Sequence, residues 1–84
     1  MQNRIILNKG SLLYLVLNGL VNQEGFDVIL NTNDKQKAVK TAKELSLKLN
    51  IKEYNVWEDD SDVVFSSESD SQWVEIRITK LNIV

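Results

Sequence analysis

The chain of 84 residues contains neither cysteine nor histidine and carries a formal net charge of −2. These absences exclude disulfides, thiolate catalysis and Cys-based metal sites, and they remove the commonest general base near neutral pH. With 43% hydrophobic and 26% charged residues, the composition is that of a single globular domain over 1–84, too small for a cofactor cavity. We therefore expect a protein that is not an enzyme and has no cofactor.

The longest apolar run, Leu12–Leu17, has six residues and is far too short to span a bilayer. The first residues, Met1-Gln-Asn-Arg, lack the layout of a secretory signal, because no small-residue cleavage site follows a sustained apolar stretch. These features predict a cytoplasmic protein.

The residues before position 31 predict extended structure. Arg4–Leu7 is a short apolar run that ends at turn-forming residues, which indicates a strand. Leu12–Leu17 is apolar on both faces, which fits a central strand or a buried helix capped by Ser11. The dipeptide Asn18-Gly19 favours the strand, since it supplies the positive φ angles of a tight hairpin turn.

Residues 20–25 fit either a second hairpin arm or a loop. Because Leu12–Leu17 fits a strand or a helix, residues 11–24 are expected to form either a hairpin or a short helix. Phe26, Val28 and Leu30 then alternate with more polar positions, which predicts a strand with these three side chains on one face.

A helix is predicted over about 33–49, with Thr32 or Asn33 as the N-cap and Asp34 near the positive end of the helix dipole. Asn50 is the expected left-handed residue after the helix. The predicted buried stripe consists of Ala38, Ala42, Leu45 and Leu49. The predicted lysine face consists of Lys37, Lys40, Lys43 and Lys48, with an exposed Leu47 among them.

Three further strands are predicted after the helix, at Glu53–Trp57, Val63–Phe65 and Trp73–Ile78, because each alternates or is apolar between turn residues. The predicted order is β-β-β-α-β-β-β. The economical assembly is an α+β fold, in which a single antiparallel or mixed sheet of about five to six strands carries one helix on one face.

Acidic residues are concentrated after the helix. From Glu58 to Glu75 there are seven carboxylates, and no Lys or Arg lies between Lys52 and Arg77. Residues 1–57 instead carry eight Lys or Arg against five Asp or Glu. The chain is therefore expected to be polarised, with an acidic patch over 58–70.

This acidic patch does not match a metal or catalytic motif. Glu58, Asp60 and Asp62 match the first three ligands of a calcium loop, but Val63 and Ser69 occupy its glycine and its twelfth position. Carboxylate pairs used in acid–base catalysis need a pocket that perturbs their pKa values, and a solvated loop provides none. We therefore predict no catalytic residue and no metal ligand.

A cluster of carboxylates next to Trp57 can instead dock on a basic protein surface, although a solvated loop without a function explains the same composition. Trp57 is the aromatic residue most expected to be exposed, because it adjoins the charged region. The predicted partner-binding residues are Trp57, Glu58, Asp59, Asp60, Asp62, Glu68 and Asp70.

In size, acidity and lack of catalytic side chains, the chain resembles the small inhibitors encoded by phages and other mobile elements. Those proteins block host defence nucleases, some by mimicking the charge of DNA. The resemblance implies an inhibitor that binds a basic, nucleic-acid-binding protein and neither nucleic acid itself nor a membrane.

Two alternatives remain from the sequence. The first is a structural or assembly protein that self-associates, as a homodimer for example, by pairing Trp73–Ile78 across a sheet edge. The second is a nucleic-acid binder that uses the lysine face of the helix. The overall acidity, with a pI near 5.0, weakens the second alternative.

Overall fold

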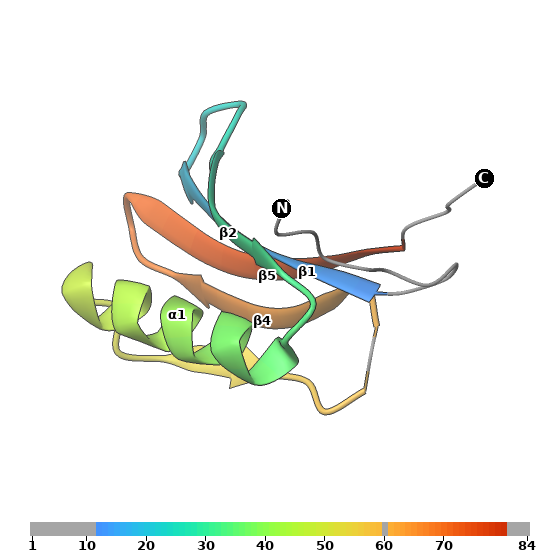
Figure 1. Cartoon of the computed structure of the whole chain (residues 1–84). Coiled ribbons are helices and arrows are strands. Elements are labelled where there is room, and N and C mark those ends of the chain that lie inside the picture. Colours follow the sequence, from blue (N-terminus) through green and yellow to red (C-terminus); the bar gives the residue numbers. More distant parts are fainter. Residues whose placement is uncertain (1–11, 60, 81–84) are drawn as a thin grey trace, which may run out of the picture.

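The computed structural model describes residues 12–59 and 61–80, which form five strands and one helix (Figure 1). The elements in chain order are β1 (Leu12–Leu20), β2 (Asp27–Thr32), α1 (Lys35–Lys48), β3 (Tyr54–Val56), β4 (Val63–Glu68) and β5 (Gln72–Lys80).

The strands form an antiparallel sheet in the order β2-β1-β5-β4-β3. β1 and β5 pair along their full length, from Leu12 opposite Lys80 to Leu20 opposite Gln72. Helix α1 lies across one face of the sheet (Figure 1). The predicted α+β class, with a single sheet and a helix on one face, is therefore confirmed.

The predicted order β-β-β-α-β-β-β differs from the observed order, β-β-α-β-β-β. The predicted strand Arg4–Leu7 lies outside the described residues, and the next two predicted strands correspond to β1 and β2. In the described part of the chain, two strands rather than three therefore precede α1.

The prediction of a turn at Asn18-Gly19 is wrong, because both residues lie inside β1. The indole of Trp73 lies against Gly19, and a Cβ at position 19 would overlap its ring atoms Cζ2 and Cε2. Asn18 Nδ2 donates a hydrogen bond of 2.9 Å to the carbonyl of Trp73. The chain reverses after Leu20 instead, where Asn22 and Gly25 adopt φ angles of 67° and 93°.

A bulge in β2 changes which side chains share a face. Val16 is opposite Leu30 and Leu17 is opposite Val28, so Ile29 is the extra residue. Leu30 therefore packs against the core below α1, whereas Val28 lies on the other face and is exposed. The prediction that Phe26, Val28 and Leu30 share one face is wrong because alternation along a strand stops at a bulge.

Helix α1 begins one or two residues later than its predicted caps. Asp34 is the N-cap, and its Oδ1 accepts a hydrogen bond of 3.2 Å from the backbone N–H of Lys37. Thr32 Oγ1 accepts a hydrogen bond from the backbone N–H of Asp34 at 3.1 Å. At the other end Asn50 has a φ of 60°, which confirms its predicted left-handed conformation.

The core lies between α1 and the inner strands. Ala38 and Ala42 are fully buried, which lets the helix backbone approach the sheet closely, and Leu45 and Leu49 are partly buried beside them. The strands contribute Tyr14, Val16, Val64, Phe65, Val74 and Ile76. No helix in the described part of the chain is long and apolar enough to cross a membrane.

One buried polar contact joins the helix to the sheet and was not predicted. Ser46 and Ser67 are 1% and 3% exposed, and their hydroxyl oxygens lie 2.7 Å apart in a hydrogen bond. Ser46 lies on the buried side of α1 near Ala42, whereas the predicted buried stripe contained only apolar residues. The pair fixes α1 relative to β4, because each hydroxyl satisfies the other away from water.

We expect Gly19→Ala to lower the free energy of unfolding by about 1–3 kcal/mol, because the added methyl group overlaps the Trp73 indole. Chemical denaturation measures this change. The double variant Gly19→Ala/Trp73→Leu should lose less than the sum of its two single substitutions. Strict additivity of the two losses would contradict the close contact.

We expect Ser46→Ala alone to cost about 1–3 kcal/mol of unfolding free energy, because it leaves the buried Ser67 hydroxyl without its partner. The double variant Ser46→Ala/Ser67→Ala should be no less stable than the single one, since no hydroxyl then lacks a partner. A double-mutant cycle by denaturation checks this, and a coupling free energy near zero would contradict it.

Candidate functional site

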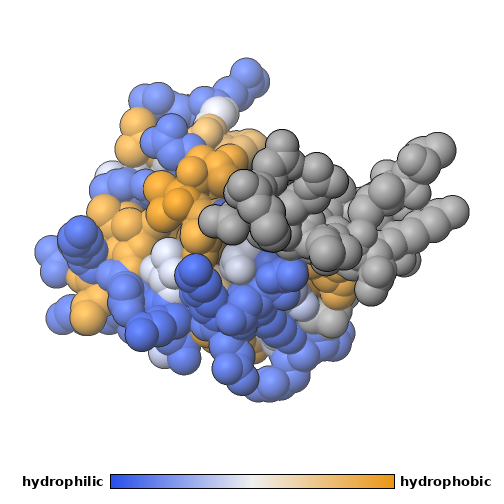
Figure 2. Space-filling model, viewed as in Figure 1, coloured by the Kyte–Doolittle hydropathy of each residue, from blue (hydrophilic) through white to orange (hydrophobic). Residues whose placement is uncertain are grey.

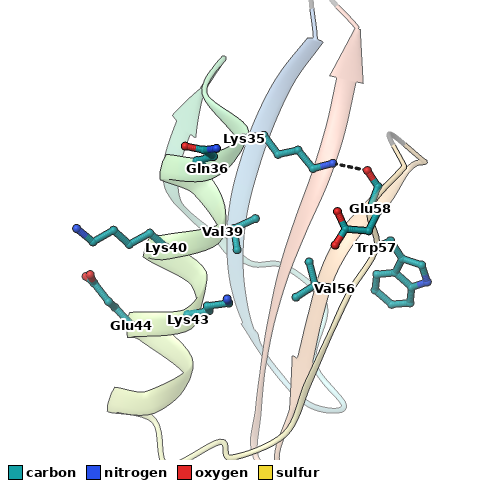
Figure 3. A pocket seen from close by; sticks show the side chains of 9 residues that line it. All are labelled: Lys35, Gln36, Val39, Lys40, Lys43, Glu44, Val56, Trp57 and Glu58. Carbon is teal, nitrogen blue, oxygen red and sulfur yellow. Dashed lines mark hydrogen bonds between the residues drawn. The ribbon is translucent and has the colours of Figure 1, made fainter.

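A groove separates α1 from the edge strand β3. The helix packs on β1, β2, β4 and β5, which leaves the side of the sheet near β3 uncovered. The resulting groove has a volume of about 590 Å³ (Figure 3). Val39 of the helix and Val56 of β3 lie between the two elements and give the groove an apolar base.

Charged side chains surround this apolar base. Lys35 Nζ donates a hydrogen bond of 2.8 Å to the carbonyl of Glu58 and so connects the helix to the chain after β3 (Figure 3). Lys40 and Lys43 also line the helix side. Lys43 Nζ lies 5.5 Å from the ring centroid of Tyr54, a cation–π distance.

β3 exposes large side chains although it belongs to the sheet. Tyr54 and Val56 of the strand, and Trp57 directly after it, are between 39% and 44% exposed. The Tyr54 ring stacks on the buried Phe65 ring with centroids 5.2 Å apart, which holds Tyr54 in place. The predicted exposure of Trp57 is confirmed. The exposure of Tyr54 and Val56 beside it was not predicted from the sequence.

The predicted partner-binding residues fall into two groups. Trp57, Glu58 and Asp59 follow β3, and Asp62 precedes β4. Glu68 ends β4 and Asp70 lies in the turn to β5. Because β4 is extended, its two ends lie on the order of 20 Å apart. Asp60 lies outside the described residues.

We name the first group the acidic loop cluster: Trp57, Glu58, Asp59 and Asp62. Ser61 Oγ contacts Asp59 Oδ1 at 3.4 Å and donates to the carbonyl of Val63 at 3.1 Å, so the loop closes on itself. The three described carboxylates are exposed, and none forms an ion pair with a residue that the structure describes. Over the same residues, no group of three or more carboxylates could hold a metal ion.

The groove divides the predicted lysine face into two pairs. At 100° per residue, the four lysines spread over about 140° of the helix circumference. Lys40 and Lys43 line the groove, whereas Lys37 and Lys48 do not. Leu47 is 75% exposed, as predicted. The nucleic-acid alternative that uses these lysines stays a prediction.

Self-association through Trp73–Ile78 is excluded by the strand order. These residues belong to β5, which pairs with β1 on one side and β4 on the other. The sheet edges formed by described residues are β2 and β3.

Four apolar side chains at the β1–β2 hairpin are exposed, which was not predicted from the sequence. These side chains are between 45% and 54% exposed, and Figure 2 shows hydrophobic surface gathered over this part of the molecule. The group consists of Leu20, Phe26, Val28 and Ile29. Period-two alternation placed Phe26 and Val28 on the same face as Leu30, and no signal in the sequence indicates the bulge at Ile29.

Comparison of the chain with protein-family models, curated proteins and solved structures gave no match.

We expect the two tryptophans to differ in access to solvent, because Trp57 is 41% exposed and Trp73 lies against Gly19. In the variant Trp73→Phe, the remaining Trp57 fluorescence should be quenched readily by acrylamide. In Trp57→Phe, the remaining Trp73 should be quenched less. Equal quenching constants would contradict the arrangement at the end of β3.

Proposed function

We propose that this protein is a non-enzymatic binding protein that docks its acidic loop cluster on a basic protein surface. The observation that carries the proposal is the position of Trp57, a half-exposed indole beside three carboxylates that have no ion-pair partner among the described residues. A large aromatic side chain next to unpaired charge is the arrangement typical of an interface anchor with a charged rim.

The backbone of Trp57 is held in place before any partner binds. Its backbone N–H donates a hydrogen bond of 3.0 Å to the carbonyl of Val64, which extends the β3–β4 pairing by one residue. The next carbonyl, that of Glu58, accepts from Lys35 Nζ. A contact residue whose backbone is fixed in this way loses little backbone entropy on binding, so more of its burial contributes to affinity.

The carboxylates supply orientation and speed of encounter. Glu58, Asp59 and Asp62 project negative charge from a segment that contains no Lys or Arg. Such a patch steers a positively charged partner into place and raises the association rate, an effect that salt screens.

Surfaces that bind nucleic acid are basic because they neutralise phosphates, so they fit this chemistry. A protein docked on such a surface competes with the nucleic acid and acts as an inhibitor. This is the behaviour of the phage and mobile-element inhibitors that the chain resembles in kind.

The proposed surface is smaller than the region 58–70 predicted from the sequence. Glu68 and Asp70 lie at the far end of β4, beside Asn50 and Lys52, and are left out of the contact. They provide a matched control, since neutralising them changes the net charge as much as neutralising two residues of the cluster.

The test is affinity capture of a partner from the native host, followed by calorimetry and stopped-flow binding with the purified pair. Trp57→Ala should weaken binding by about tenfold or more, the loss typical of an interface anchor. Asp59→Asn/Asp62→Asn should slow association and reduce its dependence on salt.

The control variant Glu68→Gln/Asp70→Asn should bind as the wild type does. Equal losses in the control and the cluster variant would show a general effect of charge. A partner bound equally well by Trp57→Ala and by Asp59→Asn/Asp62→Asn would overturn the proposal.

A further inference from the structure

The outer edge of β3 carries unused hydrogen-bonding groups. The backbone N–H of Trp57 donates to the carbonyl of Val64 in β4, and Asn55 lies opposite Ser66. Because these groups alternate in direction along a strand, Tyr54 and Val56 direct their N–H and C=O groups away from the sheet. No described residue forms a hydrogen bond with these four groups.

A second copy of β3 fits this edge when the two strands run antiparallel about Asn55. Tyr54 of each copy then lies opposite Val56 of the other copy. Both residues direct their backbone groups outward, so each pair exchanges two hydrogen bonds and the free groups are satisfied. Tyr54 and Val56 also share a face of the strand, which places their exposed side chains in contact across the junction.

The charges that flank β3 are complementary in this register. Lys52 and Glu58 flank β3 symmetrically, two residues before Tyr54 and two residues after Val56, so this register brings Lys52 of each copy to the end of the junction where Glu58 of the other copy lies. Glu53 lies opposite Trp57, so no like charges meet. Opposite charges directly across a strand pair stabilise it, and like charges destabilise it.

Neighbouring registers lack this match. Moving the second strand by two residues in one direction brings Glu53 of each copy toward Asp59 of the other copy, so that like charges approach at both ends of the junction. Moving it in the other direction places Lys52 opposite Val56 and leaves Glu58 beyond the pairing. Charged residues on a sheet edge discourage pairing with foreign strands. Here the same charges favour the register centred on Asn55 over its two neighbours.

The other edge of the sheet is less suited to pairing. β2 has a bulge at Ile29, which interrupts the regular spacing of its backbone groups. Bulges on edge strands are a common means of preventing strand addition.

We propose that β3 is a self-association edge, at which two copies of this chain form one continuous sheet through antiparallel pairing centred on Asn55. This inference concerns the chain in the absence of any partner, so a dilution series of the protein alone tests it separately from the proposed function. Trp57 and Glu58 lie beside the junction and also belong to the acidic loop cluster, so the dimer and a docked partner would compete for this end of β3. Asp59 and Asp62 lie farther from the junction.

Sedimentation velocity over a dilution series of the wild-type protein tests the proposal and should show a reversible monomer–dimer equilibrium. Val56→Pro removes an outward N–H and leaves the bonds of Asn55 and Trp57 to β4, so it should give a monomer where the wild type is dimeric. Circular dichroism shows whether this variant remains folded.

A charge exchange provides the second arm and does not depend on the proline variant. Lys52→Glu and Glu58→Lys should each raise the dimer dissociation constant by about tenfold, because each places like charges across the junction twice. The double variant Lys52→Glu/Glu58→Lys should return it to within about threefold of the wild-type value.

Lys37→Glu is the matched control, since it changes the net charge as Lys52→Glu does but lies on α1 outside the groove. It should leave the dissociation constant unchanged. A wild-type protein that is monomeric at every concentration would overturn the proposal. A dimer that survives Val56→Pro, or single-variant losses that the double variant does not restore, would show that another surface holds the copies together.

Discussion

The pairing of β1 with β5 is the interaction on which the rest of the structure depends. These strands are the first and last described elements, and they match residue for residue from Leu12–Lys80 to Leu20–Gln72. Closing so long a loop costs conformational entropy, which the burial of apolar side chains from both strands offsets. Val16, Val74 and Ile76 are fully buried at this junction, below the two alanines of α1. The close contact of Trp73 with Gly19 fixes the same pair on the other face.

With β1 and β5 in the centre, the other strands take positions that determine what the molecule presents to solvent. β2 and β3 become the edges, and α1 lies over the inner strands. The helix therefore leaves the β3 side uncovered, which opens the groove and exposes Tyr54, Val56 and Trp57. Strand β4 connects this edge to the centre and separates Asp62 from Glu68. The acidic loop cluster and the free edge of β3 are both consequences of one strand order.

Local patterns predicted most elements but not their surroundings. The spacing of Ala38, Ala42, Leu45 and Leu49 predicted the buried side of α1 correctly, because a helix on a sheet follows its own period. The turn predicted at Asn18-Gly19 is wrong because glycine is favoured both in turns and where another group approaches the backbone closely. Here Gly19 makes room for the Trp73 ring inside a strand. The bulge at Ile29 and the hydroxyl pair of Ser46 and Ser67 left no signal, since both depend on residues distant in sequence.

The sequence by itself determined the α+β composition, the absence of cysteine and histidine chemistry, and the exposure of Trp57 beside acidic residues. Each of these follows from residue identity or from neighbours a few positions away. Only the tertiary structure decided that β5 is central, that the acidic region divides at β4, and that β3 has a free edge. The physical reason is that alternation gives a strand its two faces but not its neighbours, which are selected by burial and pairing across the whole chain.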